Sequence, residues 1–347
     1  MKTKGYIAAS SCISPQSTDG TKGLGVAWNY HVTDQLEVLR PDYVKYIDPR
    51  QVRRMGKGVR MALCAGNLCI DAYGSVPDSI ITATGLGSMG STEKFLNQMI
   101  DNQEENLIPY AFLQTTSNTS GAQIALQHKI HGYNMTWVHK GISFELALID
   151  ALTLLESEES KTTLVGGFDE MTKDHAYIMH KAGLIGIGEV DMHKTYENAH
   201  PIAGEAASFF MITSENSGPQ IKSVVAESGL LSPDTCVNKV REALEEAGWD
   251  KDCDLVLLGG NGMAEHDQLI HAALGQMTAP IARFKHLCGE FETSSAFALW
   301  LAQGFMQDAS LLEELLMPNS NMPHTIQRIL IVNLFGDDNL GVVALEK

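Results

Sequence analysis

A histidine and a lysine precede an apolar segment in the stretch TWVHKGISFELALIDA, residues 136–151. His139 and Lys140 could form an acid/base pair, or they could tether a neighbouring loop or carboxylate. We favour the tether, because no chemical partner can be assigned to them. Ser143 could act as a nucleophile, but a serine needs a base to activate it, and none is assignable. From Ile142 to Leu155 the chain is apolar on nearly every side, which predicts a buried helix.

Cysteine and histidine could also supply a nucleophile or a metal site. No CxxC pair and no HExxH motif occurs, so the sequence predicts neither a metal site nor a cofactor. Scattered cysteines of this kind are expected to be buried thiols. The six cysteines are Cys12, Cys64, Cys69, Cys236, Cys253 and Cys288.

The charge of the chain restricts its partners. A formal net charge of −17 disfavours nucleic acid and acidic lipid, both of which attract basic surfaces. No run of apolar residues is long enough for a transmembrane helix, and we expect a cytoplasmic globular protein. One basic island is either a solvated helix face or a seat for an acidic partner. Its members are Arg50, Arg53, Arg54, Lys57 and Arg60.

The elements that must position these residues recur along the chain. The strand-like segments 79–90 and 254–263 both end in glycines, and each follows a helix-like segment. A buried helix and a further strand follow each of them, the second buried helix spanning residues 293–306. Apolar strands alternating with helices indicate sheets that are covered on both faces. We therefore predict two duplicated α/β halves, residues 1–216 and 217–347, with long connections of functional interest at 107–118 and 174–203.

Six segments, in this order, carry a family resemblance: YIAASSCISPQ, ATGLGSMG, PYAFLQTTSNTSGAQIALQHKIHG, GGFDE, GEAASFFMIT and NLFGDDN. Together they resemble the β-ketoacyl synthases of the thiolase superfamily from end to end. The resemblance implies a thiolase-like fold in a five-layered αβαβα arrangement. It also implies a Cys-His-His site for decarboxylative condensation, with the cysteine at the N-terminus of the first buried helix. There the helix dipole stabilises a thiolate and the oxyanion of an intermediate.

When the family's motif positions are matched to this chain, none of the three catalytic groups is present. The cysteine position falls on Gly141 and the first histidine on Gly259 or Gly260. Glu290 occupies the second histidine position, while Lys285 and Phe335 are retained. His266 lies several residues beyond the first histidine position and could substitute for it. Glu290 could act as a base beside Lys285, but a structural ion pair that fills the old pocket is the interpretation we favour.

A chain that lacks all three groups on an otherwise complete scaffold resembles a chain-length factor. Such a subunit is catalytically silent, pairs with an active ketosynthase and shapes the acyl tunnel at their interface. Glycine at the cysteine position is most similar to the truncated chain-length-factor-type synthases of bacterial aryl polyene pathways. The acyl carrier protein would dock mainly on the ketosynthase. The alternatives are a divergent condensing or acyl-transfer enzyme using Ser143, His139 or Cys288, and a homodimer without an acyl ligand.

Other positions have a role only through the resemblance. Leu86, Met89, Ala111, Phe112 and Phe335 are candidates for the acyl tunnel at the dimer interface, although plain core packing is an equal alternative for the first four. The acidic residues Asp169, Glu170 and Glu205 fall near the implied site, where we expect structural roles.

Overall fold

The computed structural model describes residues 5–17, 24, 27–30, 32–186, 188–191, 200–250, 252–318 and 320–347. Ten strands form one large sheet in the order β12-β11-β13-β14-β10-β1-β9-β6-β4-β5. Their bounds are β1 Gly5–Ile13, β4 Ser79–Thr84, β5 Asn134–Val138, β6 Thr162–Asp169, β9 Ala206–Thr213, β10 Gln220–Ser228, β11 Leu255–Gly259, β12 Ile281–Arg283, β13 Arg328–Phe335 and β14 Asn339–Glu346.

The sheet consists of two copies of one five-stranded pattern. In the first half, β1–β9 and β9–β6 are antiparallel, whereas β6–β4 and β4–β5 are parallel. The second half repeats this with β10–β14 and β14–β13 antiparallel, then β13–β11 and β11–β12 parallel. The halves join where Gly5 and Tyr6 pair with Ile221 and Gln220. The predicted duplicated, thiolase-like fold is confirmed, and the predicted division at residue 216 falls between β9 and β10.

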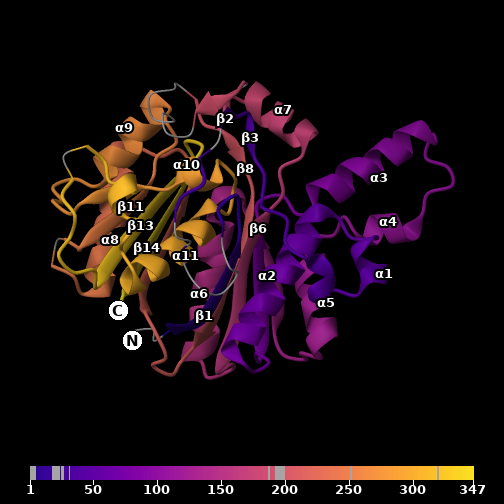
Figure 1. The fold of residues 1–347 in the computed structure, drawn as a ribbon, viewed down its shortest axis with the longest axis horizontal. Coiled ribbons are helices and arrows are strands. Elements are labelled where there is room, and N and C mark those ends of the chain that lie inside the picture. The colour runs from indigo at the N-terminus through magenta and orange to yellow at the C-terminus, as the bar shows by residue number, and fades with distance from the viewer. Residues whose placement is uncertain are drawn as a thin grey trace.

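The two halves of the sheet form two layers, and helices on the outside of each half and between the halves form the other three (Figure 1). Helices α2 (Lys57–Tyr73) and α5 (Thr119–His128) contact the outer face of the first half. Helix α8 (Pro233–Ala247) covers the second half together with α9 (Ala264–Ala273). Between the halves lie α6 (Ser143–Glu156) and α11 (Ser294–Gln307), each of which contacts strands of both.

The two central helices differ in burial, although both were predicted to be buried. Helix α11 is buried at every position from Ser294 to Met306. Helix α6 exposes Ile149, Thr153 and Glu156, which follow one another at helical spacing. The prediction for α6 is therefore wrong on one side. Beside this exposed stripe, Asp150 accepts hydrogen bonds from Trp137 Nε1 (2.9 Å) and the Tyr133 hydroxyl (3.1 Å).

The two long connections contain helices that weak periodicity concealed. Residues 107–118 include α4 (Pro109–Leu113), which with α3 (Met89–Asp101) projects beyond the rest of the molecule (Figure 1). Residues 174–203 overlap α7 (Lys173–Lys181), which buries only His175 and Met179 and so shows little pattern in sequence. The Thr172 side chain caps α7 by accepting from His175 N. Residues 187 and 192–199 of this connection lie outside the described residues.

The remaining elements are short: β2 Val32–Thr33, β3 Gln35–Leu36, β7 Val190–Asp191, β8 Ala203–Gly204, η1 Tyr43–Lys45, α1 Pro49–Val52, η2 Lys140–Ile142, α10 Lys285–Cys288 and η4 Glu313–Leu315. All six cysteines are buried thiols, as predicted. Within the ranges that the structure describes, no helix has the length and apolar character needed to cross a membrane.

Candidate functional site

Gly141 lies in η2, directly before α6, at the position that the resemblance assigns to a nucleophile. It is buried, and the end of the β13–β14 hairpin occupies the space beside it. A β-carbon built on Gly141 would overlap the β-carbon of Phe335 and lie 2.8 Å from its Cγ and 3.1 Å from Asn339 Cβ. These atoms are not the far end of a flexible side chain. The position is therefore closed to any side chain unless the hairpin shifts.

The polar residues around Gly141 are used in local structure. Lys140 Nζ lies 3.2 Å from Asp338 Oδ2, in the turn between β13 and β14, as expected of a tether. The Ser143 hydroxyl donates to Lys140 O (2.8 Å) and accepts from His139 N (2.7 Å). Both contacts close the turn into α6, and no side chain among the described residues is hydrogen-bonded to the Ser143 hydroxyl as a base. The exposed His139 makes no hydrogen bond through its ring to a described residue.

The first histidine position lies at the end of β11. A β-carbon on Gly259 would overlap the Asn333 amide oxygen and lie 3.0 Å from Asn333 Cα, while one on Gly260 would lie 2.8 Å from Asp267 Oδ1. His266 is not placed as a substitute, because its Nε2 is hydrogen-bonded to Leu334 O at 3.0 Å. Its Nδ1 lies 3.5 Å from Asp267 Oδ1. This part of the site is also filled by side chains of the second half.

Glu290, at the second histidine position, forms a buried ion pair with Lys285. Lys285 Nζ lies 2.6 Å from Glu290 Oε1 and donates to Leu334 O at 2.7 Å. The second carboxylate oxygen, Oε2, accepts from Asn261 Nδ2 at 2.9 Å. Both oxygens therefore have partners, which fits the structural ion pair better than a free base. Cys288 is equally unsuited to chemistry, because burial raises the pKa of its thiol well above the ordinary value.

A small cavity remains beside this network. It has a volume of about 280 Å³, and its walls include Asn261, His266, Glu290 and Phe335. The structure thus brings Glu290 and Phe335 to one cavity, whereas Gly141 lies behind Phe335 and does not line it. Among the polar groups that line the cavity, Asn261 Nδ2 donates to Glu290 Oε2, whereas the buried His266 Nδ1 makes no hydrogen bond with a described residue.

Comparison with known proteins identifies the scaffold. The family model described as β-ketoacyl synthase, N-terminal domain, matches residues 33–216, more than half of the chain. The chain belongs to the β-ketoacyl synthase family. No curated protein matched the sequence.

Solved structures with this fold share little sequence with the chain. The ishigamide ketosynthase/chain length factor has a TM-score of 0.85 at 15% identity, with 100% of both chains covered. The ketosynthase (ApeO) in complex with its chain length factor (ApeC) from Xenorhabdus doucetiae has a TM-score of 0.76 at 15% identity, covering 99% of this chain and 98% of that one. AntDE:AntF, a type II polyketide synthase acyl-carrier protein in complex with its ketosynthase, has a TM-score of 0.75 at 12% identity, covering 100% of this chain and 99% of that one. At these identities the likeness concerns the fold.

The acidic residues near the site of this β-ketoacyl synthase family member hold segments together. Asp169 accepts hydrogen bonds from Thr84 Oγ1 (2.7 Å) and Gly85 N (2.8 Å), and from the hydroxyl (2.7 Å) and backbone N–H (2.9 Å) of Thr293. It therefore links β4 to the start of α11. Glu205 accepts from Val38 N (2.9 Å) and Met171 N (3.1 Å), and lies 2.5 Å from Lys57 Nζ.

Most of the tunnel candidates are not core residues. Leu86 and Phe112 are 46% and 54% exposed, and the Phe112 ring packs on Phe95 with 5.7 Å between centroids. Met89 and Ala111 are half-buried, and Ala111 lines the large cavity between α2 and α3 described below. Core packing is therefore wrong for Leu86 and Phe112. Phe335 is buried and occupies the space next to Gly141.

Two buried carboxyl groups, those of Glu145 and Glu292, were not predicted from the sequence. Glu145, in the first turn of α6, is fully buried, and neither carboxyl oxygen makes a hydrogen bond with a described residue. Burial raises its pKa to about 7, which the nearby Ser295 hydroxyl and Lys285 offset only in part. Burial and the charge of Asp169 raise the pKa of Glu292 to about 8. A glutamate inside the apolar run SFELAL was the available sequence signal for Glu145.

Proposed function

We propose that this chain is a catalytically silent, chain-length-factor-type subunit that pairs with an active ketosynthase. The observation that carries the proposal is the closure of the nucleophile position. Gly141 has no side chain, and Phe335 and Asn339 fill the space that one would need. Such a subunit would act in the cytoplasm, in polyketide or fatty-acid synthesis, with the aryl polyene type as the specific expectation.

The other two positions support a silent role. Decarboxylative condensation needs groups that stabilise an enolate, and donors aimed at the developing charge are the usual means. Here one position is Gly259, packed against Asn333, and the other is Glu290, a negative group held by Lys285 and Asn261. A carboxylate at this place would oppose an enolate instead of stabilising it.

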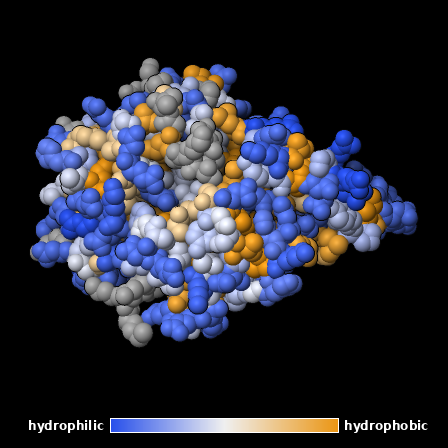
Figure 2. Space-filling view, turned by 60° about the horizontal axis from the view of Figure 1, so that its bottom comes forward, coloured by the Kyte–Doolittle hydropathy of each residue, from blue (hydrophilic) through white to orange (hydrophobic). Residues whose placement is uncertain are grey.

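The surface of the first half supports a protein partner. Strand β5 is the last strand in the sheet order, so its outer edge pairs with no described strand. Exposed apolar side chains are concentrated between residues 86 and 138, and Figure 2 shows such residues in orange on the α3–α4 projection. They are Leu86, Leu96, Ile100, Ile108, Tyr110, Phe112, Leu113, Leu126, Tyr133, Met135 and Val138. An edge strand flanked by apolar residues is a template for pairing with another chain.

Two similar structures, the ishigamide ketosynthase/chain length factor and ApeO in complex with ApeC, contain a chain length factor together with a ketosynthase, which favours a ketosynthase as that partner. Leu86, Met89, Ala111 and Phe112 would then face the partner and limit the depth of its acyl tunnel. The carrier protein would dock mainly on the ketosynthase, because a chain of net charge −17 repels an acidic protein.

The test is intact-mass spectrometry of the purified chain after incubation with acyl- and malonyl-carrier protein, alone and with a ketosynthase encoded beside it. We expect no adduct on this chain, an acyl adduct on the ketosynthase, and a stable complex between the two. An adduct on Ser143, His139 or Cys288 would favour the divergent enzyme instead. A chain that forms only homodimers would contradict the proposed pairing.

A further inference from the structure

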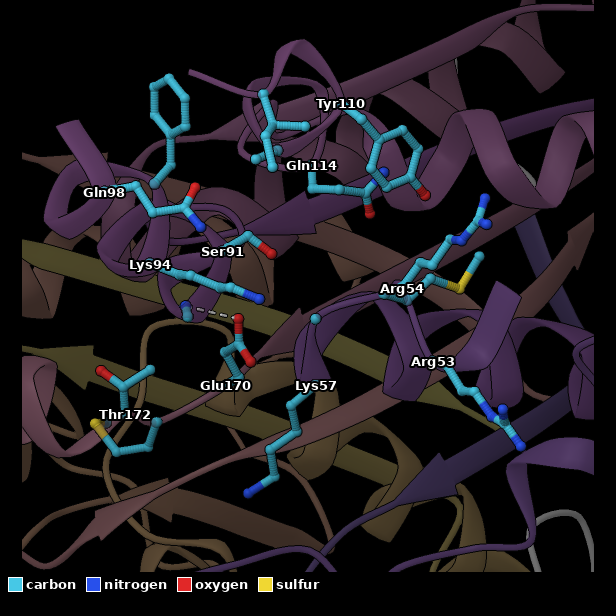
Figure 3. Close-up of a pocket in the computed structure, with 17 residues that line it drawn as sticks. Arg53, Arg54, Lys57, Ser91, Lys94, Gln98, Tyr110, Gln114, Glu170 and Thr172 are labelled. Atoms are coloured by element: carbon cyan, nitrogen blue, oxygen red, sulfur yellow. Dashed lines mark hydrogen bonds between the residues drawn. The ribbon is translucent and has the colours of Figure 1, made fainter. Parts of the chain in front are cut away.

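A second and larger cavity lies away from the closed nucleophile position. It has a volume of about 760 Å³, within the usual range for ligand pockets, and opens between α2, α3, α4 and the turn that follows α1. Glu170 is the carboxylate at its floor, and four basic side chains line it: Arg53, Arg54, Lys57 and Lys94. Figure 3 shows Arg53 and Arg54 on one side of the cavity and Lys94, from α3, on the other. This concentration of positive charge contrasts with the net charge of −17.

Three of these cations are available to a ligand. Lys57 is engaged by Glu205, at 2.5 Å. Arg53, Arg54 and Lys94 have no ion-pair partner among the residues that the structure describes. Among the described residues, Glu170 forms no ion pair with these cations, and its oxygens accept from Gly58 N (2.9 Å) and Gly90 N (3.0 Å) at the starts of α2 and α3. Unpaired cations around a concave site favour an anionic group.

The rest of the lining indicates an apolar body with a polar contact. Phe95, Ile108 and Tyr110 line the α3–α4 side, and Ile108 and Tyr110 are 57% and 45% exposed in spite of their apolar surface. On the same side, Gln114 is 8% exposed and its buried Oε1 accepts no hydrogen bond from a described residue. An unpaired buried acceptor is costly, and a donor on a bound molecule would satisfy it.

We propose that this cavity binds a small amphipathic anion. Its phosphate or carboxylate would lie among Arg53, Arg54 and Lys94, and its apolar body would cover Phe95, Ile108 and Tyr110. The site does not include Gly141, but Ile108 and Tyr110 also belong to the surface proposed to face a ketosynthase, so ligand binding is tested on the isolated chain.

The test is isothermal titration of the full chain with dodecyl phosphate and with dodecanoate, both below their micelle concentrations. We expect saturable binding at one site, weakened by added salt, and no binding of dodecyltrimethylammonium, which has the same chain and the opposite charge. Replacing Arg53, Arg54 and Lys94 with Gln should weaken binding roughly 5-fold for each charge removed. The exposed Arg50→Gln variant is the matched control, because Arg50 belongs to the same basic island but does not line the cavity.

A variant in the apolar wall separates the contribution of the apolar wall from that of the cations. Ile108→Ser should weaken dodecyl phosphate binding and leave any binding of inorganic phosphate unchanged. Equal affinity in the wild type and in the triple Gln variant would overturn the proposal, as would binding of the cationic amphiphile. A third outcome is that only an acidic carrier protein binds, that the triple variant no longer binds it, and that dodecyl phosphate does not displace it. The cavity would then be a protein-docking surface, and the small-molecule proposal would fail.

Discussion

At Gly141 the two halves of the molecule meet, because the loop before α6 lies against the last residue of β13. The contact is close enough to exclude a β-carbon, and it involves the backbone-near atoms of Phe335. The glycine and the phenylalanine therefore form one packing unit. Restoring a cysteine alone would not restore an open nucleophile site.

This packing predicts the effect of Gly141→Cys. Overpacking should destabilise the chain by about 1–3 kcal/mol, measured as a lower midpoint of urea unfolding. Phe335→Ala should be destabilising by itself, because it leaves a cavity. In the double variant the sulfur can use that space, so the combined cost should be smaller than the sum of the two single costs. Simple additivity would show that the two residues do not compete for the same volume.

Among the elements, α6 was predicted correctly in its position, but not in its contacts with the second half. Its position, the strands on both sides and the duplicated order follow from apolar runs that end in glycines, because period and length survive in a single sequence. The contact of Gly141 with Phe335 joins residues that are about 190 positions apart in the chain, and no local pattern contains it. The ion pair between Lys285 and Glu290 was predictable because the two residues are close in sequence.

Helix α6 also carries the fully buried carboxyl group of Glu145, whose pKa is raised to about 7 from an ordinary value of 4.5. Between these values the unfolded chain loses its proton while the folded chain keeps it, so stability falls as pH rises through this window. One pKa unit corresponds to 1.36 kcal/mol. Between pH 5.5 and 8 the wild type should therefore lose about 2 kcal/mol relative to Glu145→Gln, which has nothing to titrate there.

Urea unfolding at both pH values measures this difference. Glu156→Gln is the matched control, because Glu156 is an exposed carboxylate at the end of the same helix. Its pH profile should follow that of the wild type. Parallel profiles for Glu145→Gln and the wild type would show that Glu145 is ionised without penalty in the folded chain.

At the scale of the whole molecule, the duplicated halves differ in what they leave uncovered. Both end in a parallel strand, β5 in the first half and β12 in the second. Strand β5 carries Met135 and Val138, which are 42% and 43% exposed. The last strand of the second half, β12, is covered in part by a bridge from Ala282 to Leu316. The first half therefore offers the open edge that a partner subunit could extend.

If β5 pairs with a ketosynthase, Met135→Lys with Val138→Lys should weaken the complex about 30-fold or more, the effect expected for residues worth 2 kcal/mol. Lysine at a strand edge opposes pairing with another chain. Because both side chains are already exposed, the melting temperature of the isolated chain should hardly change. Leu230→Lys is the matched control, since Leu230 is 93% exposed and lies outside this surface. Analytical ultracentrifugation measures both affinities. Equal affinities of the double variant and the control would show that the ketosynthase does not bind at the edge of β5.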